Sequence, residues 1–97
     1  MPTYIPLFRY TQKGAQEIKG GPGRLDAAKQ AAKAAGGEIK AFYLTLGQYD
    51  GVIITEAPND EVVATRLLQT ASQGNLQTET LRAFTESEFR KMIAALP

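Results

Sequence analysis

The chain has 97 residues, of which 43% are hydrophobic and 22% charged, and its net charge at pH 7 is +1. This length predicts one domain spanning residues 1–97, and the near-neutral charge gives no basis for binding nucleic acid or an anionic membrane. The sequence contains no cysteine and no histidine. Disulfides, thiol catalysis and histidine ligation of zinc or haem are therefore excluded, and no cofactor or metal site is predicted. Because no stretch resembles a signal peptide or a membrane span, we expect a cytoplasmic protein.

The first predicted strand covers residues 3–10 and has apolar side chains on both faces. Ile5 and Leu7 alternate to one side, whereas Tyr4 and Phe8 alternate to the other. Strands that are apolar on both faces are covered on both sides. We therefore expect helices on one face of the sheet and a second layer on the other.

Two helical segments follow this strand. Residues 11–19 predict a short helix, and residues 24–35 predict a longer, alanine-rich helix with apolar positions at helical spacing. The glycine-rich run 20–23 matches neither the dinucleotide fingerprint nor a phosphate-binding loop. It therefore predicts a break between the helices rather than a phosphate site.

A β-hairpin is predicted at the centre of the chain. Its strands, 38–46 and 49–57, flank Gly47-Gln48, which suits a two-residue type II′ turn. This turn sets the register by pairing Leu44 with Gly51, and it leaves both faces of the hairpin largely apolar.

The C-terminal part of the chain predicts a helix, a strand and a further helix. Residues 58–74 begin with an Asx cap and acidic residues, which stabilise a helix start, and Leu68 belongs to the predicted buried stripe of this helix. Residues 75–84 read as the fourth strand. A capping box at Thr85 and Glu88 then opens a terminal helix. The apolar residues of that helix recur at helical spacing: Phe89, Met92, Ile93 and Leu96.

The order β-α-β-β-α-β, followed by a helix, predicts an α+β fold of the ferredoxin-like plait type. Its antiparallel sheet has the strand order 4-1-3-2, and the helices lie on one face. The other face is then both open and apolar, which is typical of an interface. We expect a homodimer in which two such faces pack together.

Four short motifs are distributed along most of the chain: Tyr43-Leu44-Thr45-Leu46-Gly47-Gln48-Tyr49-Asp50, Glu56-Ala57-Pro58-Asn59-Asp60, Gly74-Asn75 and Thr80-Leu81-Arg82-Ala83-Phe84. Their combination resembles the GYD-domain family, with one residue inserted between the glycine and the Tyr-Asp pair. The resemblance implies a dimeric α/β barrel but no particular activity. Proteins that share only this fold include cofactor-free monooxygenases, lactone isomerases, haem enzymes and amino-acid-sensing domains, so the fold says little about function.

The candidate ligand-binding residues lie at one rim of the predicted sheet and on the fourth strand: Arg9, Tyr43, Thr45, Tyr49, Asp50, Thr78 and Thr80. At the rim, Arg9 is suited to hold a substrate carboxylate while Asp50 or a tyrosine moves a proton. The alternative, which we favour, is that Asp50 binds turn amides or pairs with Arg9 and is structural.

The fourth strand offers two threonines whose orientation decides their role. If Leu81 and Ala83 face the helices, Thr78 and Thr80 face the cavity between the two sheets of a dimer. There they would orient a small ligand or hold interface water, and the sequence leaves both roles open.

Two functions remain open at this level. One is a homodimeric small-molecule-binding or assembly module without catalysis. The alternative is a cofactor-independent oxygenase or isomerase acting in the barrel cavity. Without histidine or cysteine, its base would be Asp50, a glutamate or a tyrosine. This short list of bases favours the binding module.

Overall fold

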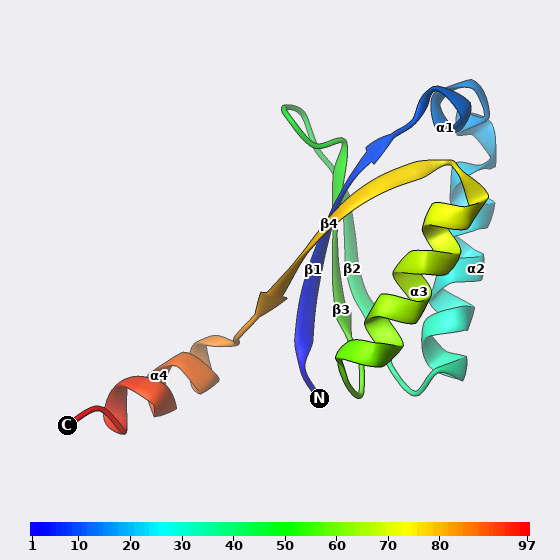
Figure 1. Cartoon of the computed structure of the whole chain (residues 1–97). Helices are drawn as coiled ribbons and strands as arrows, with labels where there is room; N and C mark the ends of the chain where they lie inside the picture. Colours follow the sequence, from blue (N-terminus) through cyan, green and yellow to red (C-terminus); the bar gives the residue numbers. More distant parts are fainter.

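The computed structural model covers residues 1–97 and contains the predicted elements in the predicted order (Figure 1). They are β1 (Thr3–Tyr10), α1 (Gln12–Gln16), the 3-10 helix η1 (Ile18–Gly20), α2 (Gly21–Ala34), β2 (Glu38–Leu44), β3 (Gly51–Glu56), α3 (Asp60–Gln73), β4 (Leu76–Ala83) and α4 (Glu86–Ala94). The strands form one antiparallel sheet in the order β2-β3-β1-β4, which is the predicted order read from the other edge. The predicted ferredoxin-like α+β fold is therefore confirmed.

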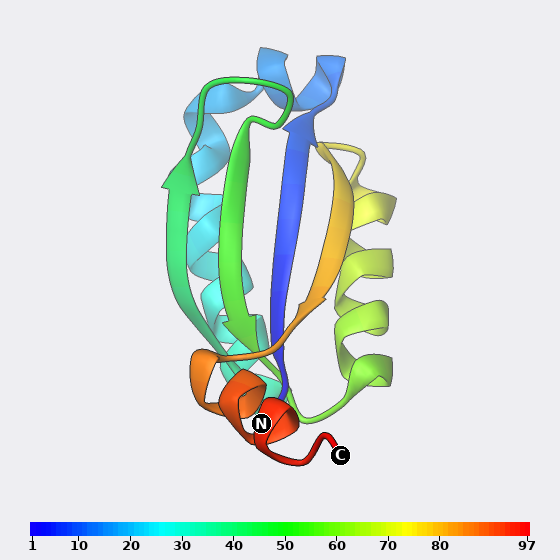
Figure 2. The same cartoon turned by 90° about the vertical axis from the view of Figure 1, so that its left-hand side faces the viewer.

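Helices α2 and α3 cover one face of the sheet and leave the other face bare (Figures 1 and 2). Under the helices, Tyr4 of β1 packs with Ala57 and Val63, and Phe8 is almost completely buried. We call the bare side the open face. Its apolar residues come from all four strands: Ile5, Leu7, Ala41, Tyr43, Val52, Ile54 and Leu81.

Helix α4 stands apart from the helices that cover the sheet. It follows β4 and projects on the side of the open face (Figures 1 and 2). The predicted capping box is present, since the Thr85 hydroxyl accepts from Glu88 N–H and the Glu88 carboxylate accepts from Thr85 N–H. No residue of α4 is buried. None of the helices combines the length and the apolar character needed to cross a membrane.

The break between the first two helices lies earlier than the sequence predicted. Helix α2 begins at Gly21, so the glycine-rich run forms its first turn. Pro22 lacks an N–H group, which is tolerated in a first turn because the N–H groups there have no partner within the helix. Helix α2 ends at Ala34, one residue before the predicted end, and Gly36 with a φ of 85° follows it.

The hairpin has the predicted register but not the predicted turn. Leu44 lies opposite Gly51 as expected, but the strands end there, and residues 45–50 form a loop. Several contacts hold this loop. Asp50 N–H donates to the Phe8 carbonyl at 2.8 Å, and Thr45 Oγ1 donates to the Tyr49 carbonyl at 2.7 Å. The Asp50 N–H thus donates to β1 rather than to the opposite strand of the hairpin.

Candidate functional site

Arg9 connects the loop of residues 45–50 to the end of β1. Its Nε donates to the Gln48 carbonyl at 2.6 Å, and its guanidinium carbon lies 4.6 Å from the centre of the Tyr49 ring. The Tyr49 hydroxyl in turn donates to the carboxylate of Glu79 on β4. The rim predicted from the sequence therefore exists, and Glu79 is a member that the sequence analysis did not include.

The hydrogen bond from Tyr49 to Glu79 has a chemical consequence. Because it stabilises the protonated phenol, and because a phenolate would face a carboxylate, it raises the pKa of Tyr49 above its ordinary value of 10.0. The pKa of Tyr4 is raised in the same way by its hydrogen bond to Asp60. Both tyrosines are thus held in the protonated form, which is unsuited to abstracting a proton at neutral pH.

Asp50 is bonded to the backbone rather than to Arg9. Its Oδ2 accepts from Tyr10 N–H at 2.8 Å, and no ion pair joins it to Arg9. Asp50 therefore binds a backbone amide, but one of β1 rather than of the turn as predicted, and the alternative pairing with Arg9 is not formed. Thr45 lies in the same loop, where its backbone N–H donates to the Asp50 carbonyl at 2.9 Å.

The expected orientation of the fourth strand is wrong. Thr78 lies opposite Phe8 and Thr80 opposite Pro6, so both threonines belong to the helix-covered face. Leu81 lies opposite Ile5 and belongs to the open face. The alternation of threonine with glutamate in this strand offers little apolar contrast, so the partner strand β1 sets its orientation.

Tyr43 is the one candidate residue that projects from the open face away from the rim. It lies opposite Val52, and its side chain is 60% exposed. The seven candidate residues therefore fall into three places, and no single pocket gathers them. Whether they bind a ligand stays a prediction.

A hollow lies on the other side of the sheet, under α2 and α3, and none of the seven candidates lines it. Two of its lining residues, Arg24 and Arg66, were not singled out from the sequence. The spacing in the sequence does indicate where Arg66 lies. It follows the buried Val63 by three residues, so both residues lie on the covered side of α3.

Comparison with known proteins relates most of the chain to one family. A family model described as "GYD domain" matches residues 4–93. A protein of Thermus thermophilus named "Glutamine synthetase and cystathionine beta-lyase binding protein" is 37% identical over 84 residues, which are 86% of this chain and 88% of the relative. The crystal structure of TTHA0845 from the same organism aligns with a TM-score of 0.53 at 24% identity, covering 88% of this chain and 95% of that one. The likeness to that crystal structure supports the fold alone.

Proposed function

Since the chain belongs to the GYD-domain family, we propose that it is a protein-binding module of the cytoplasm, a homodimer that docks on a metabolic enzyme. The observation that carries this proposal is the presence of two uncovered apolar surfaces, the open face and helix α4. The relative from Thermus thermophilus is named for binding glutamine synthetase and cystathionine beta-lyase. We take these two enzymes as the partners to test.

The open face is assigned to a second copy of the chain. Its central residues, among them Leu7, Val52 and Ile54, are half-buried only by their own neighbours and have no layer above them. Apolar sheet faces of this kind pack face to face about 10 Å apart, and a two-fold axis makes one patch complementary to itself.

Helix α4 is assigned to the enzyme. Phe89, Met92 and Ile93 lie at helical spacing on α4 and are each between 46% and 57% exposed. Leu96, which the sequence placed in the same helix, follows its end at Ala94 and is 65% exposed. The capping box stabilises the start of the helix locally. An amphipathic helix with anchors at this spacing fits a hydrophobic groove on another protein.

The chemistry at the rim supports binding over catalysis. A proton-abstracting enzyme needs a base whose pKa lies near the working pH. Tyr49 has a raised pKa instead, and Asp50 is bonded to the Tyr10 amide. The residues at the rim are thus placed to hold the loop together, and no observation favours the oxygenase or isomerase alternative.

The test measures whether purified glutamine synthetase and cystathionine beta-lyase bind to the immobilised chain. Both enzymes are taken from the organism that produces this chain. We expect at least one enzyme to bind, and we expect the double variant Phe89→Ser/Ile93→Ser to lose most of that binding. Removing two apolar anchors of a helix typically costs about 1–2 kcal/mol each at an interface, or about tenfold or more in affinity. Lys91→Ser, on the same helix, is the matched control.

Sedimentation of the double variant completes this experiment. If it remains a dimer and loses the enzyme, α4 is the enzyme-binding surface. If it becomes a monomer, α4 belongs to the homodimer interface instead. If neither enzyme binds the parent chain, the proposed function is wrong.

A further inference from the structure

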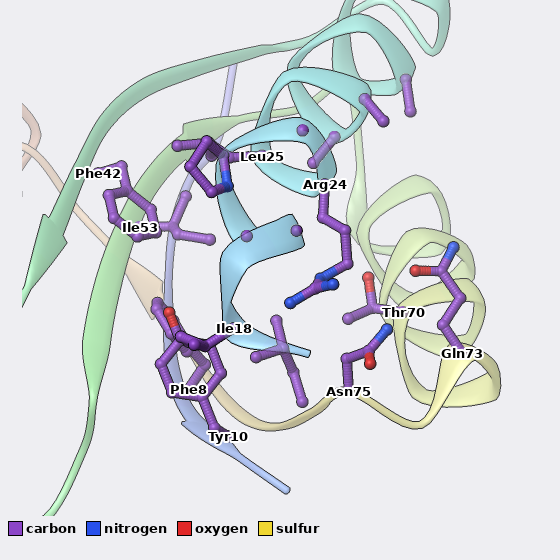
Figure 3. A pocket seen from close by; sticks show the side chains of 18 of the residues that line it. Phe8, Tyr10, Ile18, Arg24, Leu25, Phe42, Ile53, Thr70, Gln73 and Asn75 are labelled. Atoms are coloured by element: carbon purple, nitrogen blue, oxygen red, sulfur yellow. The ribbon is translucent and has the colours of Figure 1, made fainter. Parts of the chain in front are cut away.

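A cavity of about 1180 Å³ lies between the helix-covered face of the sheet and the helices α2 and α3 (Figure 3). One part of its wall is apolar and is built from both layers. The sheet contributes Phe8, Tyr10, Phe42 and Ile53, and the helical layer contributes Ile18 and Leu25. Ile18 is exposed by 43% although it lines the cavity, so this apolar wall is accessible from solvent.

The other part of the wall is polar and positively charged. Figure 3 shows Arg24 reaching from α2 into the cavity, with Thr70 and Asn75 on the neighbouring wall. Arg66 of α3 also lines the cavity, and no aspartate or glutamate does. The two arginines donate only to backbone carbonyls, Arg24 to Glu17 at 3.0 Å and Arg66 to Ala28 at 3.4 Å.

Neither positive charge is neutralised within the chain. All ion pairs of the molecule involve Lys40 or Arg90. Burial without a counter-charge lowers the pKa of Arg66 below its ordinary value. An anion in the cavity would remove this penalty, because a partly desolvated cation is stabilised by an opposite charge.

Asn75 provides a second, independent sign that the polar wall is incomplete. Its side chain is only 8% exposed, and its Oδ1 has no hydrogen-bond partner. Buried polar atoms are almost always bonded to protein, water or a ligand. A bound molecule with a polar end at this wall would supply the missing partner, with the amide oriented to suit it.

We propose that this cavity binds an amphipathic carboxylate, a molecule with an apolar chain or ring system and one carboxylate group. The apolar wall buries the hydrocarbon part, and the planar guanidinium groups of Arg24 and Arg66 match the geometry of a carboxylate. This site lies on the opposite side of the sheet from the open face. It is therefore independent of the proposed function and is tested separately.

Isothermal titration with octanoate, and with 1-octanol as its neutral counterpart, tests the proposal. We expect one octanoate per chain and weaker binding of 1-octanol. Arg24→Gln and Arg66→Gln should each weaken octanoate binding by about tenfold, since each removes a charged hydrogen-bond donor, while 1-octanol is unaffected. Lys29→Gln is the matched control, because it removes a charge from an exposed position of α2 that does not line the cavity.

Asn75→Asp gives a test that preserves the side-chain shape. It places a negative charge at the polar wall and should weaken octanoate but not 1-octanol. Melting curves identify any variant that has not folded, and the remaining variants still decide the result. The proposal is overturned if octanoate fails to bind at about 1 mM, if it binds with several molecules per chain, or if the variants bind it as tightly as the parent does.

Discussion

At the residue scale, Asp50 makes two of the hydrogen bonds that hold the loop of residues 45–50 against the sheet. Asp50 uses its side chain to accept from Tyr10 N–H and its own N–H to reach the Phe8 carbonyl. The two bonds join the loop to two residues at the end of the same strand. Asp50 therefore provides hydrogen-bond partners for the backbone at the end of β1, where the regular pairing with β3 stops.

This role predicts different effects for two substitutions of Asp50. Asp50→Asn retains an acceptor oxygen and should change the free energy of unfolding little. Asp50→Ala leaves the Tyr10 N–H without its partner and should cost about 1–3 kcal/mol. Urea unfolding of both variants measures the difference, and an alanine variant as stable as the parent would disprove the structural role.

Gly51 is a second position at which a single added atom, the Cβ of any other residue, would disturb the packing. A Cβ built there would lie 2.2 Å from the Cζ of Phe8 and 2.9 Å from the Tyr43 carbonyl oxygen. The absence of a side chain thus lets the Phe8 ring, which is only 2% exposed, lie over β3.

Gly51→Ala should therefore displace the Phe8 ring and lower the free energy of unfolding by about 1–3 kcal/mol, as overpacking does. Gly23→Ala is the control, because a Cβ there meets no atom within 4 Å and lies in the first turn of α2. Alanine is a better helix former than glycine, so this variant should be as stable as the parent or more so. Equal melting temperatures for the two variants would contradict the packing argument.

At the element scale, α4 is a helix whose start is stabilised locally. None of its residues is buried, and its capping box supplies partners for its first N–H groups. The pKa of Glu88 is lowered from its ordinary value of 4.5, chiefly because the carboxylate accepts from the Thr85 backbone N–H, and further because it bonds with the Thr85 side chain.

The lowered pKa of Glu88 predicts that the start of α4 depends on pH. A carboxylate with a lowered pKa stabilises the folded form above its unfolded pKa, and this contribution is lost as the pH falls through the folded value. Amide exchange and the chemical shift of the Thr85 N–H should therefore show the cap intact at pH 7 and opening below the ordinary value of 4.5. Glu88→Gln should remove the transition, since glutamine retains an acceptor but does not titrate; a transition that persists in this variant would belong to another group.

At the scale of the whole molecule, the isolated chain exposes more surface than its size requires. Its accessible surface is 6627 Å², against about 5,400 Å² expected for a folded monomer of this mass. Its radius of gyration is 14.7 Å, against about 12.5 Å for a compact chain of this length. Only 10 of 97 residues are buried. A second layer over the open face would supply the missing burial.

We therefore predict a dimer at micromolar concentration, with an interface of about 1,600 Å² in total. Leu7→Glu places a charge in the middle of the open face and should give a monomer, because a buried unpaired carboxylate is strongly disfavoured. Leu68→Glu makes the same exchange on α3, where the side chain is 71% exposed, and should leave the dimer intact. Sedimentation velocity distinguishes the two, and a monomeric parent chain would refute the interface.

The sequence by itself determined the order of the elements, the approximate position of most of their ends and the register of the hairpin. These features depend on neighbours in the chain. Asn59 caps α3 by accepting from Val62 N–H at 3.0 Å, and Gly74 ends that helix with a φ of 77°. Such contacts span only a few residues, so residue type and spacing are sufficient to predict them.

Only the tertiary structure decided which way the weakly patterned segments face. Leu68 was expected in the buried stripe of α3 but lies outside it, and Thr78 follows the register set by Phe8. The loop at residues 45–50 likewise depends on a carbonyl group of β1, and the charged cavity depends on two helices that bring Arg24 and Arg66 to the same space. In each case the deciding contact joins residues far apart in the chain, and the free energy that selects it comes from packing between layers rather than from local propensity.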